Sequence, residues 1–386
     1  MNYTYPQMNF QLTEEQLAVQ QAARDFAQNE LLPGVIERDT EAKFPEALQR
    51  RMGELGFMGM MTDPKYNGGG MDTISYVLAI EELSKVDASA SVMMSVNNSL
   101  VCWGLEKNGS EEQKQKYLKR LAAGEVIGAF CLSEPEAGSD ATSQRTTAED
   151  KGDYYLLNGT KNWITNGSSA SVYLVMCQTD AAKKHKGINC LIVERGMPGF
   201  VVGKKEDKMG IRGSDTHSLM FTDVKVPKAN RIGEEGFGFT FAMGTLNGGR
   251  IGIAAQALGI AAGAYELALK YSKERKAFGH YLSEHQAIQF KLAEMATKID
   301  AARLLIWQAA FLKDQKKNFV RAAAMAKLFA SQIAQEVTTE AVQIHGGYGY
   351  VKEFHVERLM RDAKITQIYE GTTEIQKMVI SRELLR

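Results

Sequence analysis

The order in which local sequence patterns follow one another is the strongest constraint on the fold of this chain. From residue 13 to about 127, apolar side chains recur at helical intervals. Residues 128 to 236 form short runs rich in β-branched and aromatic residues, and helical periodicity returns from Gly238 onward. Helices, then strands, then helices is an unusual order, and it predicts a multidomain α+β protein of three parts.

Capping signals delimit helices within the first part. Thr13 is followed three residues later by Gln16, and Ser110 by Gln113, so that each hydroxyl and each amide side chain can satisfy the other residue's backbone N–H. Gly124 is suited to end the helix that follows Ser110. We therefore expect an N-terminal α-helical domain over residues 1–127.

Turn residues separate the strand-like runs of the middle part. Gly, Asn and Asp stand between YYLLNG, NWITNG, SVYLVMCQT, INCLIVE, GFVVG and SLMFTDVKV, which predicts a small antiparallel β-barrel or sandwich over residues 128–236. The remaining residues, 237–386, contain Ala-rich periodic segments near 238–273, 285–313, 319–344 and 371–385, which predict a four-helix bundle.

Charge and targeting signals exclude several classes of protein. Lys plus Arg and Asp plus Glu number 46 each, so no excess of positive charge is present for a nucleic acid or an anionic membrane. No signal peptide and no run of about 18 apolar residues is found, which predicts a cytoplasmic or equivalent soluble location. Cys102, Cys131, Cys177 and Cys190 lack a C-x-x-C pair, and the six histidines lack a metal-binding spacing, so we expect buried thiols and no metal.

Three segments are candidates for a functional site. Glu370 precedes a glycine in RDAKITQIYEGTTEIQ, although an acidic residue near a helix N-terminus is also favoured by the helix dipole alone. The segment CLSEPEAGSD (131–140) lies where helices give way to strands, a junction that ligands favour, but it is also compatible with a polar surface turn. In NWITNG, alternation places Trp163 and Thr165 on one face of a strand, which suits a planar ring system or plain core packing.

The glycines of HGGYGY at 345–350 indicate a close approach of backbone to a ligand. They do not follow a strand within a β–α–β unit. A dinucleotide fingerprint of the Rossmann kind is therefore rejected.

Taken together, the motifs resemble the acyl-CoA dehydrogenase family, most closely its short-chain (butyryl-CoA) members, over essentially the whole chain. The segments that carry the resemblance, in the family's order and spacing, are SEPEAGSD, GTKNWITNG, KKEDKMGIRGSDT, GRIGIAAQALGIA, ERKAFG, HQAIQFKLAEMA, QIHGGYGY and RDAKITQIYEGTTEIQ. The resemblance implies the same three domains, one FAD per subunit and a homotetramer.

The resemblance also implies a mechanism. Glu370 would be the base that removes a proton from carbon 2 of an acyl-CoA thioester, while FAD takes a hydride from carbon 3. The Glu370 amide would polarise the thioester carbonyl, Gly371 would leave room for the acyl chain, and Tyr369 would line the pocket. Related enzymes that draw their base from the helix carrying LNGGR would have it at residue 249, which is glycine here.

Ligand contacts are implied residue by residue. Those to the FAD of the same subunit are Phe130, Leu132, Ser133, Ser139, Trp163, Thr165, Thr372 and Glu374. Those to the FAD of a neighbouring subunit are Arg275, which would neutralise the pyrophosphate, Phe278, Gln286 and the stretch Gln343 to Gly347, including Gly346. An ion pair within YSKERK is the alternative role for Arg275. Substrate contacts implied are Ser139, Asn247, Arg250, Tyr369 and Gly371.

Residue 247 departs from the short-chain pattern, which generally has Asp there. Asn247 with Gly-Gly-Arg is similar to the isobutyryl-type, branched-chain members, whereas VNNSL at 96–100 favours a short straight chain of about four carbons. The electron acceptor implied is an electron-transferring flavoprotein. The alternatives are a branched-chain dehydrogenase, an acyl-CoA oxidase, and a non-dehydrogenating, nucleic-acid-associated flavoprotein of the same fold.

Overall fold

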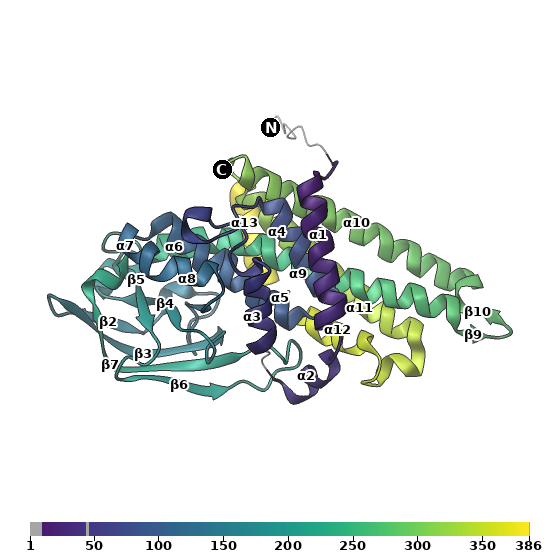
Figure 1. Ribbon diagram of the computed structural model, residues 1–386, viewed down its shortest axis with the longest axis horizontal. Coiled ribbons are helices and arrows are strands. Elements are labelled where there is room, and N and C mark those ends of the chain that lie inside the picture. Colours follow the sequence, from purple (N-terminus) through teal and green to yellow (C-terminus); the bar gives the residue numbers. More distant parts are fainter. Residues whose placement is uncertain (1–9, 44–45, 386) are drawn as a thin grey trace.

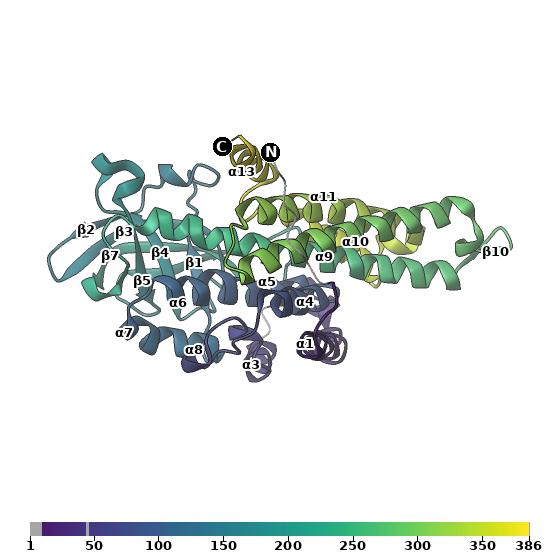
Figure 2. The ribbon, with the colours of Figure 1, turned by 90° about the horizontal axis from the view of Figure 1, so that it is seen from above.

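The structure is a computed structural model that describes residues 10–43 and 46–385. The strands gather at one end of an elongated molecule, and three long helices run from there to the other end (Figures 1 and 2). The N-terminal helices lie along one side of these long helices. The β part and the N-terminal helices thus both pack against the long helices of the last part.

The first part is helical, as predicted. Thr13 and Ser110 both form the expected capping boxes, and Gly124 has a φ of +72°, which only glycine adopts readily. The polypeptide from Ala88 to Asn108 is continuous helix with a π-helical segment at Val96–Cys102. The helices are α1 (Glu14–Phe26), α2 (Val35–Glu41), α3 (Glu46–Glu54), α4 (Thr73–Ser84), α5 (Ala88–Ser95), α6 (Trp103–Asn108), α7 (Glu111–Gln113) and α8 (Lys119–Ala122).

The middle part is one sheet in the order β6-β7-β3-β2-β4-β5-β8, with β1 paired to β4. Two runs expected as separate strands, YYLLNG and NWITNG, form the single strand β3, because the chain passes through Gly159 without turning. Pairing is antiparallel except where β4 meets β1 and β2, so a purely antiparallel arrangement was wrong. The strands are β1 (Gly128–Cys131), β2 (Thr147–Asp150), β3 (Tyr154–Thr165), β4 (Val172–Gln178), β5 (Ile188–Glu194), β6 (Phe200–Lys205), β7 (Thr216–Pro227) and β8 (Arg231–Ile232).

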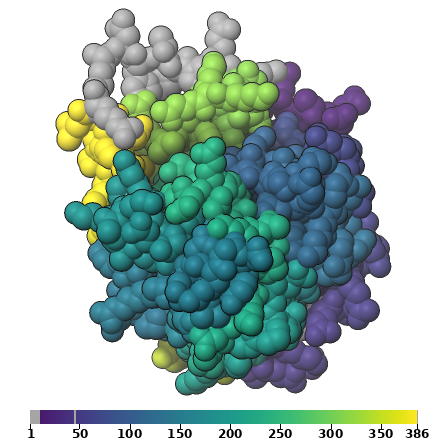
Figure 3. Space-filling model, turned by 90° about the vertical axis from the view of Figure 1, so that its left-hand side faces the viewer, coloured from purple at the N-terminus to yellow at the C-terminus, as the bar shows by residue number. Residues whose placement is uncertain are grey.

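Strands β4 and β5 join the two hydrophobic cores of the protein. Alternate residues of β4 point to opposite faces: Leu174 and Met176 enter the core shared with the helices, while Tyr173 and Val175 enter the core of the sheet. Both strands are therefore apolar without interruption. In Figure 3, which looks onto this end, the teal surface of the β part lies directly beside the blue surface of the N-terminal helices.

The last part contains three long helices and two short ones within the described residues. The long helices are α9 (Gly238–Glu274), α10 (Gln286–Asp314) and α11 (Val320–His345); α12 (His355–Ile365) and α13 (Thr373–Leu384) follow, and a small hairpin of β9 (Lys276–Ala277) and β10 (His280–Tyr281) joins α9 to α10. All four predicted helical segments are present, the fourth as the shorter α13, and α12 was not predicted. Its apolar face is narrow because Arg358 and Asp362 pair in the interior beside Val356 and Leu359.

Helix α9 is the central element of the fold. It is long and apolar enough to cross a membrane by length and composition, but 83% of its most apolar window is buried inside the protein. Four glycines and five alanines of its sequence from Gly249 to Gly263 let α4, α5 and α11 approach closely. The apolar character of α9 therefore serves packing within this fold.

Candidate active site

Glu370 lies in a short loop between α12 and α13. The amides of residues 366–369 donate to carbonyls in the last turn of α12, and the Thr372 side chain caps α13 by accepting from the Ile375 amide. Glu370 and Gly371 have φ values of +52° and +90°, both in the left-handed region. A non-glycine residue there is uncommon, which points to a conformation imposed by the surroundings.

This conformation directs the Glu370 carboxylate inward, against α9. Oε2 is enclosed and has no hydrogen-bond partner in the described part of the chain. A Cβ added at Gly249 would lie 2.2 Å from that oxygen and 2.8 Å from Leu100 Cδ2. The dipole of the following helix, the alternative reason for an acidic residue here, does not explain why the carboxylate is directed against α9. Residue 249 must be glycine for the carboxylate to occupy this position.

The electrostatic environment makes Glu370 suited to accept a proton near neutrality. Burial raises the pKa of its carboxyl to about 7, and the positive charges of Lys327 and Arg250 limit the rise. No acceptor among the described residues takes the Glu370 amide N–H, so that group is free to bind a ligand oxygen. A base and a hydrogen-bond donor thus belong to the same residue.

One face of α9 forms the floor beside Glu370. Gly249, Gly252 and Gln256 follow one another at helical spacing on this face. A Cβ at Gly252 would lie 2.4 Å from the Tyr76 hydroxyl, and the Tyr369 hydroxyl donates to Gln256 Oε1. Two tyrosines therefore close the space along α9 beyond the carboxylate.

The predicted substrate residues do not all gather at this point. Arg250 is 5% exposed and donates from Nη1 to Asn247 Oδ1 at 2.5 Å, while its Nε has no partner in the described residues. Tyr369 and Gly371 flank Glu370 in the loop. Ser139 is exposed in the turn that follows β1. The structure thus places four of the five around Glu370 and α9.

The junction segment 131–140 is fastened to β3. The Asn162 amide donates to the Ser133 carbonyl at 2.9 Å, and the buried Lys161 ammonium binds Glu134 at 2.7 Å and the Leu132 carbonyl at 3.0 Å. Phe130, at the end of β1, stacks on Phe241 of α9. The segment therefore lies where the sheet, β3 and α9 meet.

Trp163 occupies a bulge in β3 and not a regular strand position. Its φ is +60°, and the pairing with β7 shifts register between Lys161 and Ile164. Ile164 is buried in the sheet core, whereas Trp163 is 59% exposed and Thr165 is partly exposed. The large indole surface and the neighbouring hydroxyl are available to a planar ligand.

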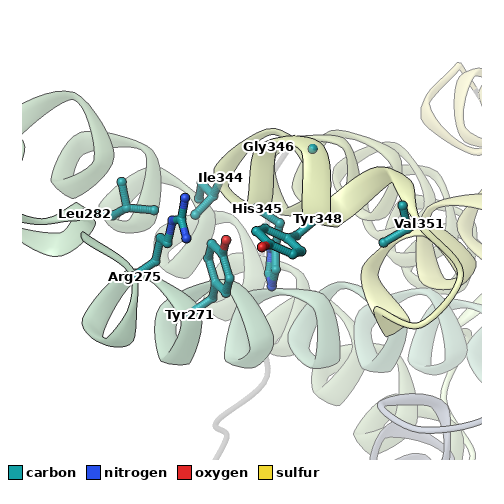
Figure 4. Close-up of a pocket in the computed structure, with 9 residues that line it drawn as sticks. Tyr271, Arg275, Leu282, Ile344, His345, Gly346, Tyr348 and Val351 are labelled. Atoms are coloured by element: carbon teal, nitrogen blue, oxygen red, sulfur yellow. The ribbon is translucent and has the colours of Figure 1, made fainter. Parts of the chain in front are cut away.

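Thr372 caps α13 and Glu374 lies exposed in its first turn, whereas the residues predicted to contact the FAD of a neighbouring subunit gather at the far end of the molecule. Arg275 follows α9, Phe278 is 96% exposed in the turn between β9 and β10, and Gln286 begins α10. A cavity of about 520 Å³ is lined by Arg275, Gly346 and Gly347 together with Tyr271, His345 and Tyr348 (Figure 4). Gln343 is exposed one turn before these glycines.

Arg275 lies at the rim of this cavity. Its guanidinium lies 5.5 Å from the Tyr348 ring centre, and it forms no ion pair within the described residues. The alternative of an ion pair within YSKERK is therefore not supported. Around Gly346 and Gly347 a Cβ would meet nothing within 4 Å, so the backbone is open to a ligand.

Three contacts of the site were missed from the sequence. Lys327 of α11 donates to the Gly371 carbonyl at 2.6 Å, and Gln376 of α13 donates to the same carbonyl at 2.8 Å. Leu100 packs against Gly249. The available signal for Lys327 was a lone lysine in the Ala-rich apolar run AAAMAKLFA, because a fully buried lysine needs a specific partner.

Fold and site together define a class: a helical–β–helical protein with an enclosed carboxylate base and an exposed indole at its sheet–helix junction. The chain matches three domains of one family, acyl-CoA dehydrogenase: the N-terminal domain over residues 13–125, the middle domain over 129–224 and the C-terminal domain over 236–385. The chain belongs to the acyl-CoA dehydrogenase family. Membership confirms the predicted fold class, the enzyme class and FAD as the cofactor.

Several relatives match at full length. A short-chain specific acyl-CoA dehydrogenase of Clostridium acetobutylicum is 50% identical over 98% of this chain and 100% of its own. The solved butyryl-CoA dehydrogenase of Megasphaera elsdenii is 50% identical, covers 98% and 100% of the two chains, and has a TM-score of 0.97. A chain in a structure that concerns the electron-transferring flavoprotein of Acidaminococcus fermentans is 54% identical, with the same coverage and TM-score.

The residues present fit FAD by the chemistry of their groups. The exposed Trp163 ring, the Thr165 hydroxyl and the 131–140 segment suit a flat heteroaromatic ring with polar edges. Arg275 and the open backbone at Gly346 and Gly347 suit a pyrophosphate. The sheet that carries the first set and the β9–β10 hairpin beside Arg275 lie at opposite ends of the molecule in Figure 1.

Proposed function

We propose that this protein dehydrogenates a short, straight-chain acyl-CoA of about four carbons to the trans-2-enoyl-CoA, with Glu370 as the base. The observation that carries the proposal is the enclosed, unpartnered Oε2 of Glu370, held against Gly249 in a carboxyl group whose pKa is raised to about 7. Full-length relatives named as short-chain specific and butyryl-CoA dehydrogenases support it.

The residues of the chain perform one half of the reaction. Glu370 removes the proton from carbon 2, whose acidity comes from the adjacent thioester carbonyl. The Glu370 amide N–H binds that carbonyl oxygen as negative charge develops on it. FAD, when bound, supplies the hydride acceptor for carbon 3. The positive φ of Glu370 allows its amide and its carboxylate to serve the same thioester.

A short acyl chain is favoured by the tyrosines over α9. Tyr76 and Tyr369 fill the face of α9 next to Gly252 and Gln256, so the space beyond the carboxylate is limited. Asn247 has an explanation within the chain, because it is the hydrogen-bond partner of Arg250. It therefore does not by itself require a branched substrate.

We further propose the ligand contacts and the assembly. Phe130, Leu132, Ser133, Ser139, Trp163, Thr165, Thr372 and Glu374 would hold FAD from one subunit, and Arg275, Phe278, Gln286, Gln343, Gly346 and Gly347 from its neighbour in a homotetramer. Ser139, Asn247, Arg250, Tyr369 and Gly371 would contact the substrate. We place the domain boundaries at 127/128 and 236/237, and we expect the protein to be cytoplasmic. We also propose that its electron acceptor is an electron-transferring flavoprotein, as the A. fermentans relative suggests.

Anaerobic titration with acyl-CoAs tests the proposal. Butyryl-CoA is expected to bleach the flavin absorption of the purified protein within seconds. Glu370→Gln should keep its FAD, and its rate of flavin bleaching should fall at least about a thousandfold, because the general base is lost. Bleaching by isobutyryl-CoA alone would overturn the straight-chain assignment, bleaching by no thioester would overturn the enzyme assignment, and rapid peroxide formation in air would indicate an oxidase.

A further inference from the structure

Lys327 is a buried cation next to the catalytic loop. It lies on α11 with no exposed surface, and its ammonium donates to the Gly371 carbonyl at 2.6 Å. No carboxylate of the described residues lies within ion-pair distance of it. Burying an ammonium without a close counter-charge costs free energy, so a lysine at this position needs another interaction that offsets the cost.

Glu370 and Glu374 are the carboxylates whose charges raise the pKa of this ammonium. Burial lowers the pKa of Lys327, and the charge of Glu370 is the largest influence opposing that shift. Glu374 is exposed in the first turn of α13 and acts more weakly. Lys327 and Glu370 therefore depend on one another for charge compensation, although they share no hydrogen bond.

Arg250 is less suited to hold the loop. It approaches from α9, but its Nη1 is committed to Asn247 and none of its nitrogens bonds to residues 366–372. Gln376 binds the Gly371 carbonyl from α13 without charge. The other ionisable groups that face Glu370 or these cations are Tyr76 of α4, Tyr369 of the loop and Arg382 of α13.

We propose that Lys327 is a positioning residue for the catalytic base: its ammonium anchors the Gly371 carbonyl, which holds Glu370 in its left-handed conformation, and it stabilises the ionised carboxylate. The proposal rests on Glu370 being the base and deepens that role. Helix α11, through Lys327, would then control both the direction of the Glu370 carboxylate and the pH range in which it is ionised.

Two variants of the full-length holoenzyme separate the two parts of this role. Lys327→Met removes the hydrogen bond and the charge, whereas Lys327→Gln keeps a donor and removes only the charge. Lys313→Met is the matched control, because Lys313 of α10 is also a largely enclosed lysine with a lowered pKa, but its ammonium donates to Met61 Sδ and not to the loop.

The first readout is the rate of flavin bleaching by butyryl-CoA against pH. The rate for Lys327→Met is expected to fall at least about tenfold at pH 7, and the midpoint of the profile to rise by about one pH unit in both Lys327 variants, because loss of a positive charge disfavours the carboxylate. Lys313→Met should follow the wild type. Profiles of both Lys327 variants that coincide with the wild type would overturn the proposal.

The second readout needs no turnover. Infrared difference titration follows the protonated carboxyl band that disappears in Glu370→Gln, and the midpoint of this band should rise in Lys327→Gln. An unchanged midpoint would overturn the proposal even where Lys327→Met fails to fold. If no acyl-CoA bleaches the wild type, the proposed function fails, and the infrared titration still decides whether Lys327 controls Glu370.

Discussion

Glu370 is a residue that the fold holds at an energetic cost. Its φ is in the left-handed region, and its carboxylate oxygen has no partner in the described protein. Both features are typical of groups kept ready for a ligand and not of groups selected for stability. The consequences are measurable in the stability of the protein as well as in its rate.

Glu370→Gln should stabilise the protein at pH 8 and not at pH 4.5. The folded-state pKa of Glu370 is about 7, above the value of about 4.3 in an unfolded chain, so the stability present below pH 4.3 is lost as the pH rises through 7. Gln does not titrate and avoids this loss. We expect the free energy of unfolding of Glu370→Gln to exceed that of the wild type by about 1–3 kcal/mol at pH 8. The gain should lie toward the lower end of this range, because Lys327 loses its counter-charge in the variant.

Denaturant unfolding of the two proteins at both pH values measures this difference. Glu374→Gln is the control, because its carboxylate is exposed and titrates with a lowered pKa, so it should show no gain at pH 8. Equal stability of wild type and Glu370→Gln at pH 8 would mean that the carboxylate is solvated in the folded protein.

Gly249→Ala tests the contact between α9 and the carboxylate. Within a helix, alanine is ordinarily favoured over glycine by about 1 kcal/mol, but here the new Cβ would lie 2.2 Å from Glu370 Oε2. We expect the carboxylate to be displaced and bleaching by butyryl-CoA to slow at least about tenfold, since small misplacements of a reacting group are costly.

Gly244→Ala is the matched control for this variant. It lies on the same helix, and a Cβ there meets nothing within 4 Å, so its bleaching rate should equal that of the wild type. If Gly249→Ala also bleaches at the wild-type rate, the carboxylate does not need the space that glycine leaves.

At the scale of elements, the junction segment depends on the buried ion pair between Lys161 of β3 and Glu134. The two groups lie 2.7 Å apart with exposed fractions of 0% and 5%, and Glu134 also accepts from the Arg145 and Thr146 amides. The pair connects β3, the 131–140 segment and the start of β2. It thereby sets the position of the residues proposed to hold the flavin ring.

Lys161→Met should destabilise the protein by about 3–5 kcal/mol, because it leaves Glu134 buried without its partner. It should also weaken FAD binding, since the Leu132 carbonyl loses its donor. Thermal unfolding and flavin content after gel filtration measure both effects. Lys151→Met removes the exposed pair with Glu149 and should cost less than about 1 kcal/mol; a similarly small cost for Lys161→Met would contradict the structural role.

At the scale of the whole molecule, the residues proposed to hold FAD are divided between the β part with α13 and the far end of the long helices. The β part and the cavity at Arg275 occupy opposite ends of the long helices (Figure 1). Phe278 is almost fully exposed in the hairpin beyond that cavity. A second subunit that brings its β part to this end would bury the hairpin and complete the site.

Hybrid assemblies test this arrangement. Trp163→Ala and Arg275→Met should each reduce FAD retention when they form an assembly alone. When the two are co-expressed and purified as a hybrid, some sites combine an intact Trp163 with an intact Arg275 from different chains, and flavin content and bleaching should recover above either parent. If FAD is bound within one chain, no such recovery occurs; sedimentation gives the number of subunits.

The sequence by itself determined the local structure and the identities of the chemical groups. Hydrogen-bonding side chains at Thr13 and Ser110 and the glycine at 124 act within a few residues, so their caps were predicted correctly. The motifs around YEGT and SEPEAGSD depend on residue identity and spacing, and they were sufficient to identify the family. Helix α12 was missed because the charged residues Arg358 and Asp362 lie on its buried face, and the two runs of β3 were divided at Gly159, through which the chain passes without turning.

Only the tertiary structure decided what surrounds those groups. Glu370 meets Gly249, Arg250 and Lys327 across α9 and α11, residues 43 to 121 positions away in the chain, and these long-range contacts set its direction and pKa. The same is true of the separation between the β part and the β9–β10 hairpin. Burial and distance between remote segments are properties of the packed molecule, because no local pattern specifies which surfaces meet.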